Sequence, residues 1–372
     1  MGTRICYFGT YDQDYCRNQI LQRGLTLAGA EVLECHSQVW RTSDKSQLSG
    51  AREKLATGLR WVGSRRDLRR QYRRMPDHDA VLVGYLGHLD TRLARSVAHP
   101  KPVVLDAFLS LYETVIEDRR MMSAGGPGAR LLKGVERRAY ESADLVLLDT
   151  QAHIDYVAEQ FRIPAERFLR IFVGADDRLF RPPAPEEDPG PADQTETTTV
   201  LFYGKFIPLH GVEVILHAAQ ILGTERQLRF QLVGTGQTYS EARKLAEELR
   251  LDNVDWVDWL PYEDLPRAIR EAQVCLGVFA PTGKALRVIP NKVFQALACG
   301  ARVVTADSPA MRELPPMGEG LTLVPPGNPE ALAQAVRELC SKPHRVEVSP
   351  GAAVFHPRAL GEELLQGLSR LS

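Results

Sequence analysis

The sequence lacks the features that mark several large classes of protein. No run of about eighteen apolar residues occurs, so no membrane-spanning helix is predicted. The six cysteines stand far apart, with no CxxC pair and no histidine at zinc-ligand spacing, which disfavours a disulfide scaffold and a zinc site. No basic-then-apolar leader opens the sequence. We therefore expect a cytoplasmic protein whose thiols are reduced.

An excess of charge of one sign is also missing. The 372 residues include 46 Lys plus Arg and 47 Asp plus Glu, which gives a net charge of -1. Hydrophobic residues make up 44% and charged residues 25%, as in an ordinary globular protein. The overall charge therefore gives no indication of nucleic acid as a partner. A chain of this length usually forms more than one domain.

Short apolar runs alternate with helix-length stretches along both halves of the chain. Examples are VVLDAF at residues 103–108 and LRFQLV at residues 228–233. Continuously apolar strands separated by helices are typical of parallel sheets that are covered on both faces. We therefore predict an α/β protein with two doubly wound, Rossmann-like domains.

The composition changes near the middle of the chain. Residues 181–199 are rich in proline, acidic residues and threonine, and they predict a linker. We place an N-terminal domain at 1–180 and a C-terminal domain at 200–355, and we expect a final helix at 356–372 to pack back on the N-terminal domain. Ligands of such sheets bind outside the carboxyl ends of the strands, so we expect the active site between the domains.

One glycine pair suggests phosphate binding. Gly234 and Gly236 follow a strand and precede a helix, which permits close approach of an anion to the backbone. The alternative is a tight turn that requires positive φ. Neither a Walker A motif nor the third glycine of the dinucleotide fingerprint is present, which disfavours a P-loop protein and a nicotinamide dehydrogenase.

A cationic segment in the C-terminal half is more informative. Pro290 suits the first turn of a helix, and it is surrounded by Lys284, Arg287 and Lys292. Three cations at a helix N-terminus would bind a diphosphate. The alternative is a set of solvated surface charges. Lys205 and His210 favour the first interpretation, because they follow the first strand of the same domain.

The order of these motifs over residues 200–340 resembles the family 4 (group 1) nucleotide-sugar glycosyltransferases. The motifs are FYGKFIPLHGVEVILHA, LVGTGQ, WLPYEDLP, IPNKVFQALACGARVVTAD and LVPPGNPEALAQAV. The resemblance implies the GT-B architecture of two facing Rossmann-like domains. It also implies that the N-terminal domain holds the acceptor and that the C-terminal domain holds the nucleotide-sugar donor.

The resemblance assigns several residues to the donor. It implies that Lys205, after Gly204, and His210 contact the diphosphate, although the usual second residue is lysine. A neighbouring diphosphate would favour the protonated form of this histidine. The other residues that we place at the donor are Gly9, Thr10, Gly234, Gly236, Leu260, Tyr262, Lys284 and Asn291. Of these, Leu260 and Tyr262 would contact the nucleobase, and Gly9 and Thr10 would face the phosphates from the opposite domain.

Two family glutamates are replaced in this chain. Their positions match Arg287 and Gln295. Gln295 retains the ability to hydrogen-bond a ribose hydroxyl, because an amide both donates and accepts. Arg287 cannot imitate the first glutamate, which contacts the sugar, and would instead add positive charge at the phosphates.

Asp106 is the candidate catalytic carboxylate. It lies where the resemblance places a catalytic histidine, near the end of a strand, and would orient the acceptor hydroxyl or act as general base. The alternative is a cap on the following helix. Lys205 and Lys292 are the candidate catalytic cations, which would stabilise the leaving diphosphate. The DxD sequence of Asp12 to Asp14 lies too early for a metal site, so we expect no metal and no cofactor besides the nucleotide-sugar co-substrate.

Residues 41–78 form a basic segment with eleven Lys or Arg and four Asp or Glu. Leu48, Leu55, Leu59 and Val62 recur beneath these charges at helical spacing. A peripheral membrane contact is one interpretation, and it suits a lipid-linked acceptor. A solvated helical face is the other.

The sequence therefore predicts a retaining, metal-independent glycosyltransferase. It would transfer a sugar from a nucleotide diphosphate sugar to a hydroxyl of a glycan, a lipid-linked acceptor or a small molecule. Two alternatives are a nucleotide-sugar epimerase, which shares this architecture, and a non-catalytic nucleotide-sugar binding protein, which would explain the loss of both glutamates.

Overall fold

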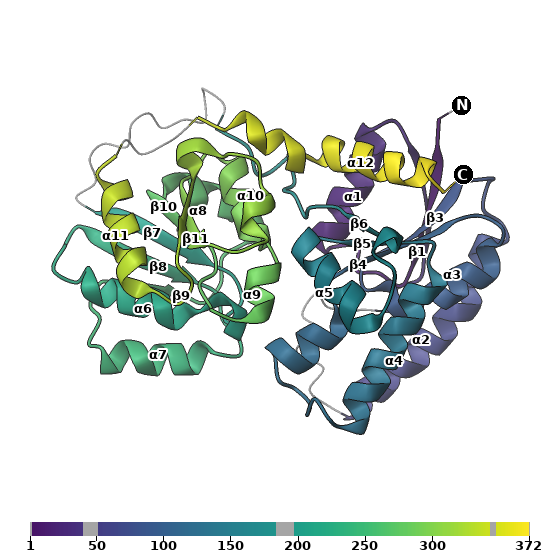
Figure 1. The fold of residues 1–372 in the computed structure, drawn as a ribbon, viewed down its shortest axis with the longest axis horizontal. Coiled ribbons are helices and arrows are strands. Elements are labelled where there is room, and N and C mark those ends of the chain that lie inside the picture. The colour runs from purple at the N-terminus through teal and green to yellow at the C-terminus, as the bar shows by residue number, and fades with distance from the viewer. Residues whose placement is uncertain (1, 40–50, 184–196, 343–346, 372) are drawn as a thin grey trace. The chain divides into compact units, whose positions relative to one another are not determined.

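The chain forms two compact units (Figure 1). Unit 1 comprises Met1–Gly174 and Phe355–Ser372, and unit 2 comprises Ala175–Val354. Most of the predicted linker, 181–199, lies outside the residues that the structure describes. Each unit is considered by itself, and a site between domains stays a prediction. The computed structural model describes residues 2–39, 51–183, 197–342 and 347–371, with only the backbone of 51–59.

Unit 1 contains a six-stranded parallel sheet in the order β2-β1-β3-β4-β5-β6. Helices connect successive strands, as the alternating pattern predicts. The strands are β1 Arg4–Gly9, β2 Glu31–His36, β3 Ala80–Val83, β4 Val103–Phe108, β5 Leu145–Leu148 and β6 Phe168–Arg170. The helices are α1 Cys16–Leu27, α2 Ala51–Tyr72, α3 Thr91–Ala98, α4 Pro127–Ser142, α5 Gln151–Phe161 and α12 Pro357–Ser369.

Unit 2 contains a second six-stranded parallel sheet in the order β12-β11-β10-β7-β8-β9. Its strands are β7 Thr198–Tyr203, β8 Leu228–Val233, β9 Val254–Val257, β10 Val274–Leu276, β11 Val303–Ala306 and β12 Leu321–Val324. Its helices are α6 Val212–Ile221, α7 Tyr239–Glu248, α8 Leu265–Glu271, α9 Gly283–Arg287, α10 Asn291–Ala298 and α11 Pro329–Cys340. The predicted fold class, two doubly wound α/β domains, is confirmed.

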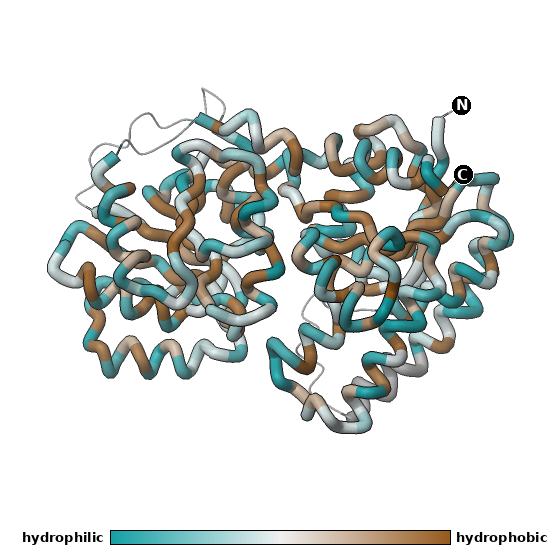
Figure 2. Tube along the Cα trace, viewed as in Figure 1, coloured by the Kyte–Doolittle hydropathy of each residue, from teal (hydrophilic) through white to brown (hydrophobic). Residues whose placement is uncertain are grey.

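The cores of both units lie along the strands. In β4 all six residues are buried, and the central strand β7 of unit 2 is buried from Val200 to Tyr203. Figure 2 shows apolar residues concentrated along these strands. Burial on both faces explains why the strands read as continuous apolar runs and not as alternating ones. Among the described residues, every helix is too short or too polar to span a bilayer.

The last helix, α12, packs on α1 within unit 1. The two backbones touch at a pair of glycines. A Cβ atom on Gly361 would lie 2.1 Å from the carbonyl oxygen of Gly24, and one on Gly24 would lie 2.3 Å from the carbonyl oxygen of Pro357. Side chains at these two positions would therefore force the helices apart.

We expect Gly361→Ala to lower the free energy of unfolding of unit 1 by roughly 1–3 kcal/mol, because the added methyl overpacks the contact with Gly24. Gly134→Ala is the matched control. Gly134 lies in α4, where an added Cβ meets nothing within 4 Å, so alanine should be neutral or stabilise by up to about 1 kcal/mol. Urea unfolding of the three proteins measures both effects. Equal stability of Gly361→Ala and the parent would contradict the close packing.

Candidate functional site

The loops after β7 and β8 are in backbone contact at the carboxyl edge of the unit 2 sheet. Gly204 directly follows β7 and has φ +136°, and its N–H donates to the carbonyl of Val233 at 2.9 Å. A Cβ atom on Gly234 would lie 2.1 Å from the carbonyl oxygen of Gly204, and one on Gly236 would lie 2.5 Å from that of Phe206. Both glycines have positive φ. The structure thus gives them a packing role, while their contact with the donor stays a prediction.

Lys292 lies beside this contact. Its side chain is buried, and its Nζ lies 3.8 Å from the centroid of the Phe202 ring and 3.3 Å from where a Cβ of Gly204 would stand. Its Nζ has no hydrogen-bond partner among the described residues. Burial lowers the pKa of Lys292 well below its ordinary value, because only an aromatic face replaces the water around the ammonium.

His210 completes this cluster. Its ring is buried, lies edge-on to Phe202 with 5.4 Å between centroids, and places Cε1 3.5 Å from the Cβ position of Gly204. The structure thus brings together Gly204, His210 and Lys292 around one aromatic ring. Lys205 follows directly and is exposed, and its contact with a diphosphate stays a prediction.

The three cations that were predicted to gather at one helix N-terminus lie on two successive helices, and their convergence on a diphosphate stays a prediction. Lys284 and Arg287 belong to the short helix α9, which ends before α10 begins, and Pro290 is the N-cap of α10 instead of a residue in its first turn. Lys292 alone of the three lies in that first turn, next to Asn291. The arginine curls back over its own helix, since its Nη1 lies 2.9 Å from the Cβ position of Gly283.

The alternative of solvated surface charges is wrong for two of the three cations. Lys284 and Lys292 are both buried, and Arg287 is partly buried. Burial of a cation is costly unless a partner compensates for it. This segment therefore differs from an ordinary solvent-exposed helical face.

The turn after β9 is joined to α10. Gln295, one turn beyond Lys292, donates through Nε2 to the hydroxyl of Tyr262 at 3.2 Å. The Tyr262 ring lies edge-on to Phe180 with 5.5 Å between centroids. Gln295 is buried, and Leu260 is partly buried. The residues predicted for the ribose and for the nucleobase are therefore in direct contact, although their contact with a nucleotide stays a prediction.

In unit 1, the predicted phosphate contacts of Thr10 are occupied. Its backbone N–H and its hydroxyl both donate to Oδ2 of Asp90, each at 2.7 Å. Gly9, with φ +126°, brings its Cβ position to 3.1 Å from the same oxygen. Asp90 therefore fixes this loop by accepting from both donors of Thr10, and a contact of Gly9 and Thr10 with a phosphate stays a prediction.

The prediction that Asp106 borders a cleft as a base is wrong. Asp106 is fully buried in β4 and forms a two-pronged ion pair with Arg17, with Nε and Nη2 at 3.0–3.2 Å. Nη1 of the arginine donates to the carbonyls of Ile171 and Phe172. Burial raises the pKa of Asp106, although Arg17 opposes the shift. Asp106 thus ties α1 to the sheet and does not cap the following helix.

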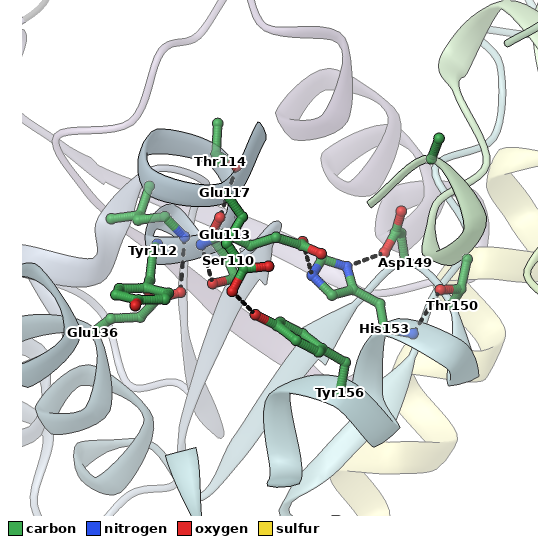
Figure 3. Close-up of polar contacts among 12 residues, drawn as sticks. Ser110, Tyr112, Glu113, Thr114, Glu117, Glu136, Asp149, Thr150, His153 and Tyr156 are labelled. Atoms are coloured by element: carbon green, nitrogen blue, oxygen red, sulfur yellow. Dashed lines mark hydrogen bonds and ion pairs between the residues drawn. The ribbon is translucent and has the colours of Figure 1, made fainter. Parts of the chain in front are cut away.

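A buried histidine cluster in unit 1 was not predicted (Figure 3). His153 in α5 contacts two carboxylates, Asp149 through Nδ1 at 2.8 Å and Glu113 through Nε2 at 3.1 Å. Burial opposes protonation, but the two carboxylates outweigh it and raise the pKa of His153 to about 9. The imidazolium thereby holds the π-helical segment Glu113–Asp118 against α5. The spacing of Asp149 and His153 was visible in the sequence, but the partnership with Glu113 was not.

The described residues contain no group of three or more His, Cys, Asp or Glu side chains arranged to hold a metal ion. Within the DxD sequence, Oδ1 of Asp12 accepts from the backbone N–H of Asp14 at 3.1 Å. The first carboxylate of this motif thus shapes its own loop.

The predicted basic segment is described only in part. Residues 40–50, and with them Leu48, lie outside the described residues, as do the side chains of Leu55 and Leu59. Val62 on α2 is exposed and does not lie beneath the charges. A membrane contact of this segment stays a prediction.

Comparison with known proteins finds similarity to glycosyltransferases. Residues 197–342 match the family model described as Glycosyl transferases group 1. The chain is 24% identical over 214 residues to the MMP alpha-(1->4)-mannosyltransferase of Mycolicibacterium hassiacum, covering 57% of this chain and 49% of that protein. It is 26% identical over 279 residues to the putative colanic acid biosynthesis glycosyl transferase WcaI of Escherichia coli, covering 73% and 65%. The chain thus spans about half to two thirds of these relatives.

A solved structure shows the same fold. The chain matches the crystal structure of Anabaena Alr3699/HepE in complex with UDP with a TM-score of 0.67 and 16% identity, covering 100% of both chains. This likeness confirms the predicted GT-B fold.

We expect His153 to make the stability of unit 1 depend on pH. Its pKa of about 9 exceeds the ordinary value of 6.5, so its contribution is complete below pH of about 6.5 and is lost as the pH rises through about 9. At about 1.4 kcal/mol per pH unit, the loss is roughly 3 kcal/mol. Urea unfolding across this range should show a larger decline for the parent than for His153→Gln. Parallel declines would contradict the ion pairs.

Proposed function

We propose, on the premise that residues 197–342 are a group 1 glycosyltransferase domain, that this chain transfers a sugar from a nucleotide diphosphate sugar to an acceptor hydroxyl. The observation that carries the proposal is the ammonium of Lys292, which is buried beside Gly204 and has no hydrogen-bond partner among the described residues. A diphosphate supplies the anionic oxygens that this ammonium lacks. The two relatives named as transferases support transfer over epimerisation or binding alone.

The chemistry follows from charge at the leaving group. As the bond between sugar and diphosphate breaks, negative charge grows on the diphosphate. Lys292 and the positive end of the α10 helix dipole would stabilise that charge, because both are fixed before the reaction begins. His210 would add a donor, and a bound diphosphate would favour its protonated form. Lys205 would add the exposed cation.

We infer retention of anomeric configuration and no requirement for a metal. Fixed cations and amides take the place of a divalent ion at the diphosphate, and the leaving diphosphate itself would accept the acceptor proton. With Asp106 in a buried ion pair, no carboxylate base is assigned. Activity in excess EDTA and the anomeric configuration of the product, measured by NMR, test these two points.

The nucleobase would lie at the turn from Leu260 to Tyr262, and the ribose would lie near Gln295. The hydrogen bond between these two residues supports this placement, because it couples the turn to α10. UDP is the first nucleotide to test, since the HepE structure contains it. The acceptor would carry a hydroxyl on a glycan, a lipid-linked group or a small molecule. The six free cysteines support a reducing, cytoplasmic location.

Incubation with UDP-sugars tests the reaction. We expect release of UDP by slow hydrolysis when no acceptor is present. A new isomer of the intact nucleotide sugar would identify an epimerase instead. Tight binding with neither outcome, for any nucleotide sugar, would identify a binding protein.

We expect Lys292→Ala to weaken UDP binding by roughly 1.5–3 kcal/mol, the contribution of a charged hydrogen bond. This is about 10- to 150-fold in dissociation constant, measured by isothermal titration calorimetry. Lys244→Ala is the matched control, because Lys244 is an exposed unit 2 lysine that pairs with Glu248 on α7. Unchanged affinity in Lys292→Ala would remove this residue from the site.

A further inference from the structure

A second cationic site lies in unit 1, on the helical layer formed by α2, α3 and α4 (Figure 1). A pocket of about 470 Å³ opens there between α2 and α4, over the short 3₁₀ turn Gly87–Leu89 and α3. Its polar lining consists mainly of Trp61, Arg65, Arg69, His88, Arg92 and Arg138. Four guanidinium groups from three helices therefore surround one cavity.

Among the described residues, the lining of this pocket carries no carboxylate, although Arg65 interacts electrostatically with the buried Asp90. Arg65 donates to the carbonyl of Leu89 at 3.4 Å and lies 4.9 Å from the Trp61 ring centroid. Arg69, Arg92 and Arg138 form no ion pair with any side chain that the structure describes. Guanidinium groups gathered without counter-charge favour an anion with several oxygens, above all a phosphate, which they bind in two-pronged fashion.

A buried imidazole adds an independent indication. His88 lines the pocket and is only 2% exposed, and neither ring nitrogen has a hydrogen-bond partner among the described residues. Burial lowers the pKa of His88 to about 4, so the ring is neutral at pH 7 and keeps one N–H to donate. A buried donor without a partner costs folding free energy. A ligand oxygen in the pocket would satisfy it.

The surroundings of the pocket are apolar as well as cationic. Leu89 in its lining is 49% exposed, Val62 on α2 is 56% exposed, and Leu131 on α4 is 68% exposed. Helical spacing places Val62 on the same face as Arg65 and Arg69, and Leu131 on the same face as Arg138. Of the eight large apolar side chains that are exposed among the described residues, these are three.

The apolar and cationic groups are ordered along the helices. Both α2 and α4 connect parallel strands and therefore run in the same direction. Val62 precedes the pocket arginines Arg65 and Arg69 on α2, and Leu131 precedes the pocket arginine Arg138 on α4, so these two apolar residues lie toward the same end of the pocket. A free phosphate has no apolar part to pack on these side chains, whereas an amphiphile has one.

We propose that this pocket binds the phosphoryl head group of an anionic lipid, with its apolar part on Val62, Leu89 and Leu131. The head group would accept hydrogen bonds from the arginines on both walls and from His88 beneath them. The site lies in unit 1 and is distinct from the proposed nucleotide site in unit 2, so it is tested without reference to transferase activity. In this proposal, the basic segment binds a specific ligand and is not merely attracted to a membrane by diffuse surface charge.

Binding to vesicles tests this site. The probes are phosphatidylcholine vesicles with and without phosphatidic acid, and the variant is Arg69→Gln/Arg138→Gln, which removes one cation from each wall. The matched control is Arg70→Gln/Arg137→Gln, which removes the same charge from neighbouring positions on the same helices outside the pocket lining. We expect the parent to bind only the phosphatidic acid vesicles, the pocket variant to bind at least about tenfold more weakly, and the control to change less than about threefold.

Three results would overturn the proposal. Equal losses in the two double variants would reduce the binding to diffuse electrostatics. An unchanged affinity of the pocket variant would exclude the pocket. Binding of glycerol phosphate in solution, lost in the pocket variant but without any binding to vesicles, would show a phosphate site and refute a lipid as its source. Thermal unfolding of each variant, expected to match the parent, confirms that a loss reflects binding.

Discussion

The absence of side chains at a few glycines determines how the carboxyl edge of the unit 2 sheet is built. Gly204 and Gly234 allow the loops after β7 and β8 to touch through their backbones. Gly211 allows the loop after β7 to approach the loop after β10, because a Cβ atom on Gly211 would lie only 2.5 Å from the backbone nitrogen of Ala280. These three loops follow β7, β8 and β10, which are neighbours in the sheet. Lys292 and His210 lie next to the backbone of Gly204, where a side chain would otherwise stand. Any added methyl group there would occupy the space in which the candidate anion site is formed.

Two buried cations of this chain, Arg17 and Lys292, differ in whether the fold compensates for the loss of their hydration. Arg17 directs its donors to Asp106 and to two carbonyl groups, so its desolvation is compensated within the fold. Lys292 meets only the face of Phe202, and its pKa is lowered because nothing compensates for the lost water. The first arrangement supports the packing of α1 on the sheet. The second costs stability at neutral pH, and a bound anion would relieve that cost, which is the reason for proposing Lys292 as a binding residue.

The fold could be predicted from the sequence because it depends on local patterns. The apolar run of β4 and the presence of a helix after Pro290 follow from residues that are near in sequence. The site residues were predicted less well, because a side chain's partner is set by tertiary structure. Asp106 lies at a strand position that suits a base, and only folding reveals that Arg17, 89 residues earlier, pairs with it. For the same reason, the sequence did not predict Glu113 as the partner of His153 or Asp90 as the partner of Thr10.

The two proposed anion sites rest on the same physical principle. Lys292 and His88 each bury a nitrogen that has no hydrogen-bond partner among the described residues. A fold normally satisfies such groups, because each one left alone costs about 1–3 kcal/mol. A ligand that supplies the missing acceptor binds the folded state and not the unfolded one, so it stabilises the unit that holds it. The folding free energy that each unsatisfied nitrogen costs is thus linked to the selectivity of its site for anions. A neutral ligand cannot satisfy the arginines around His88 or the ammonium of Lys292, whereas a phosphate or diphosphate satisfies both charge and hydrogen bonding at once.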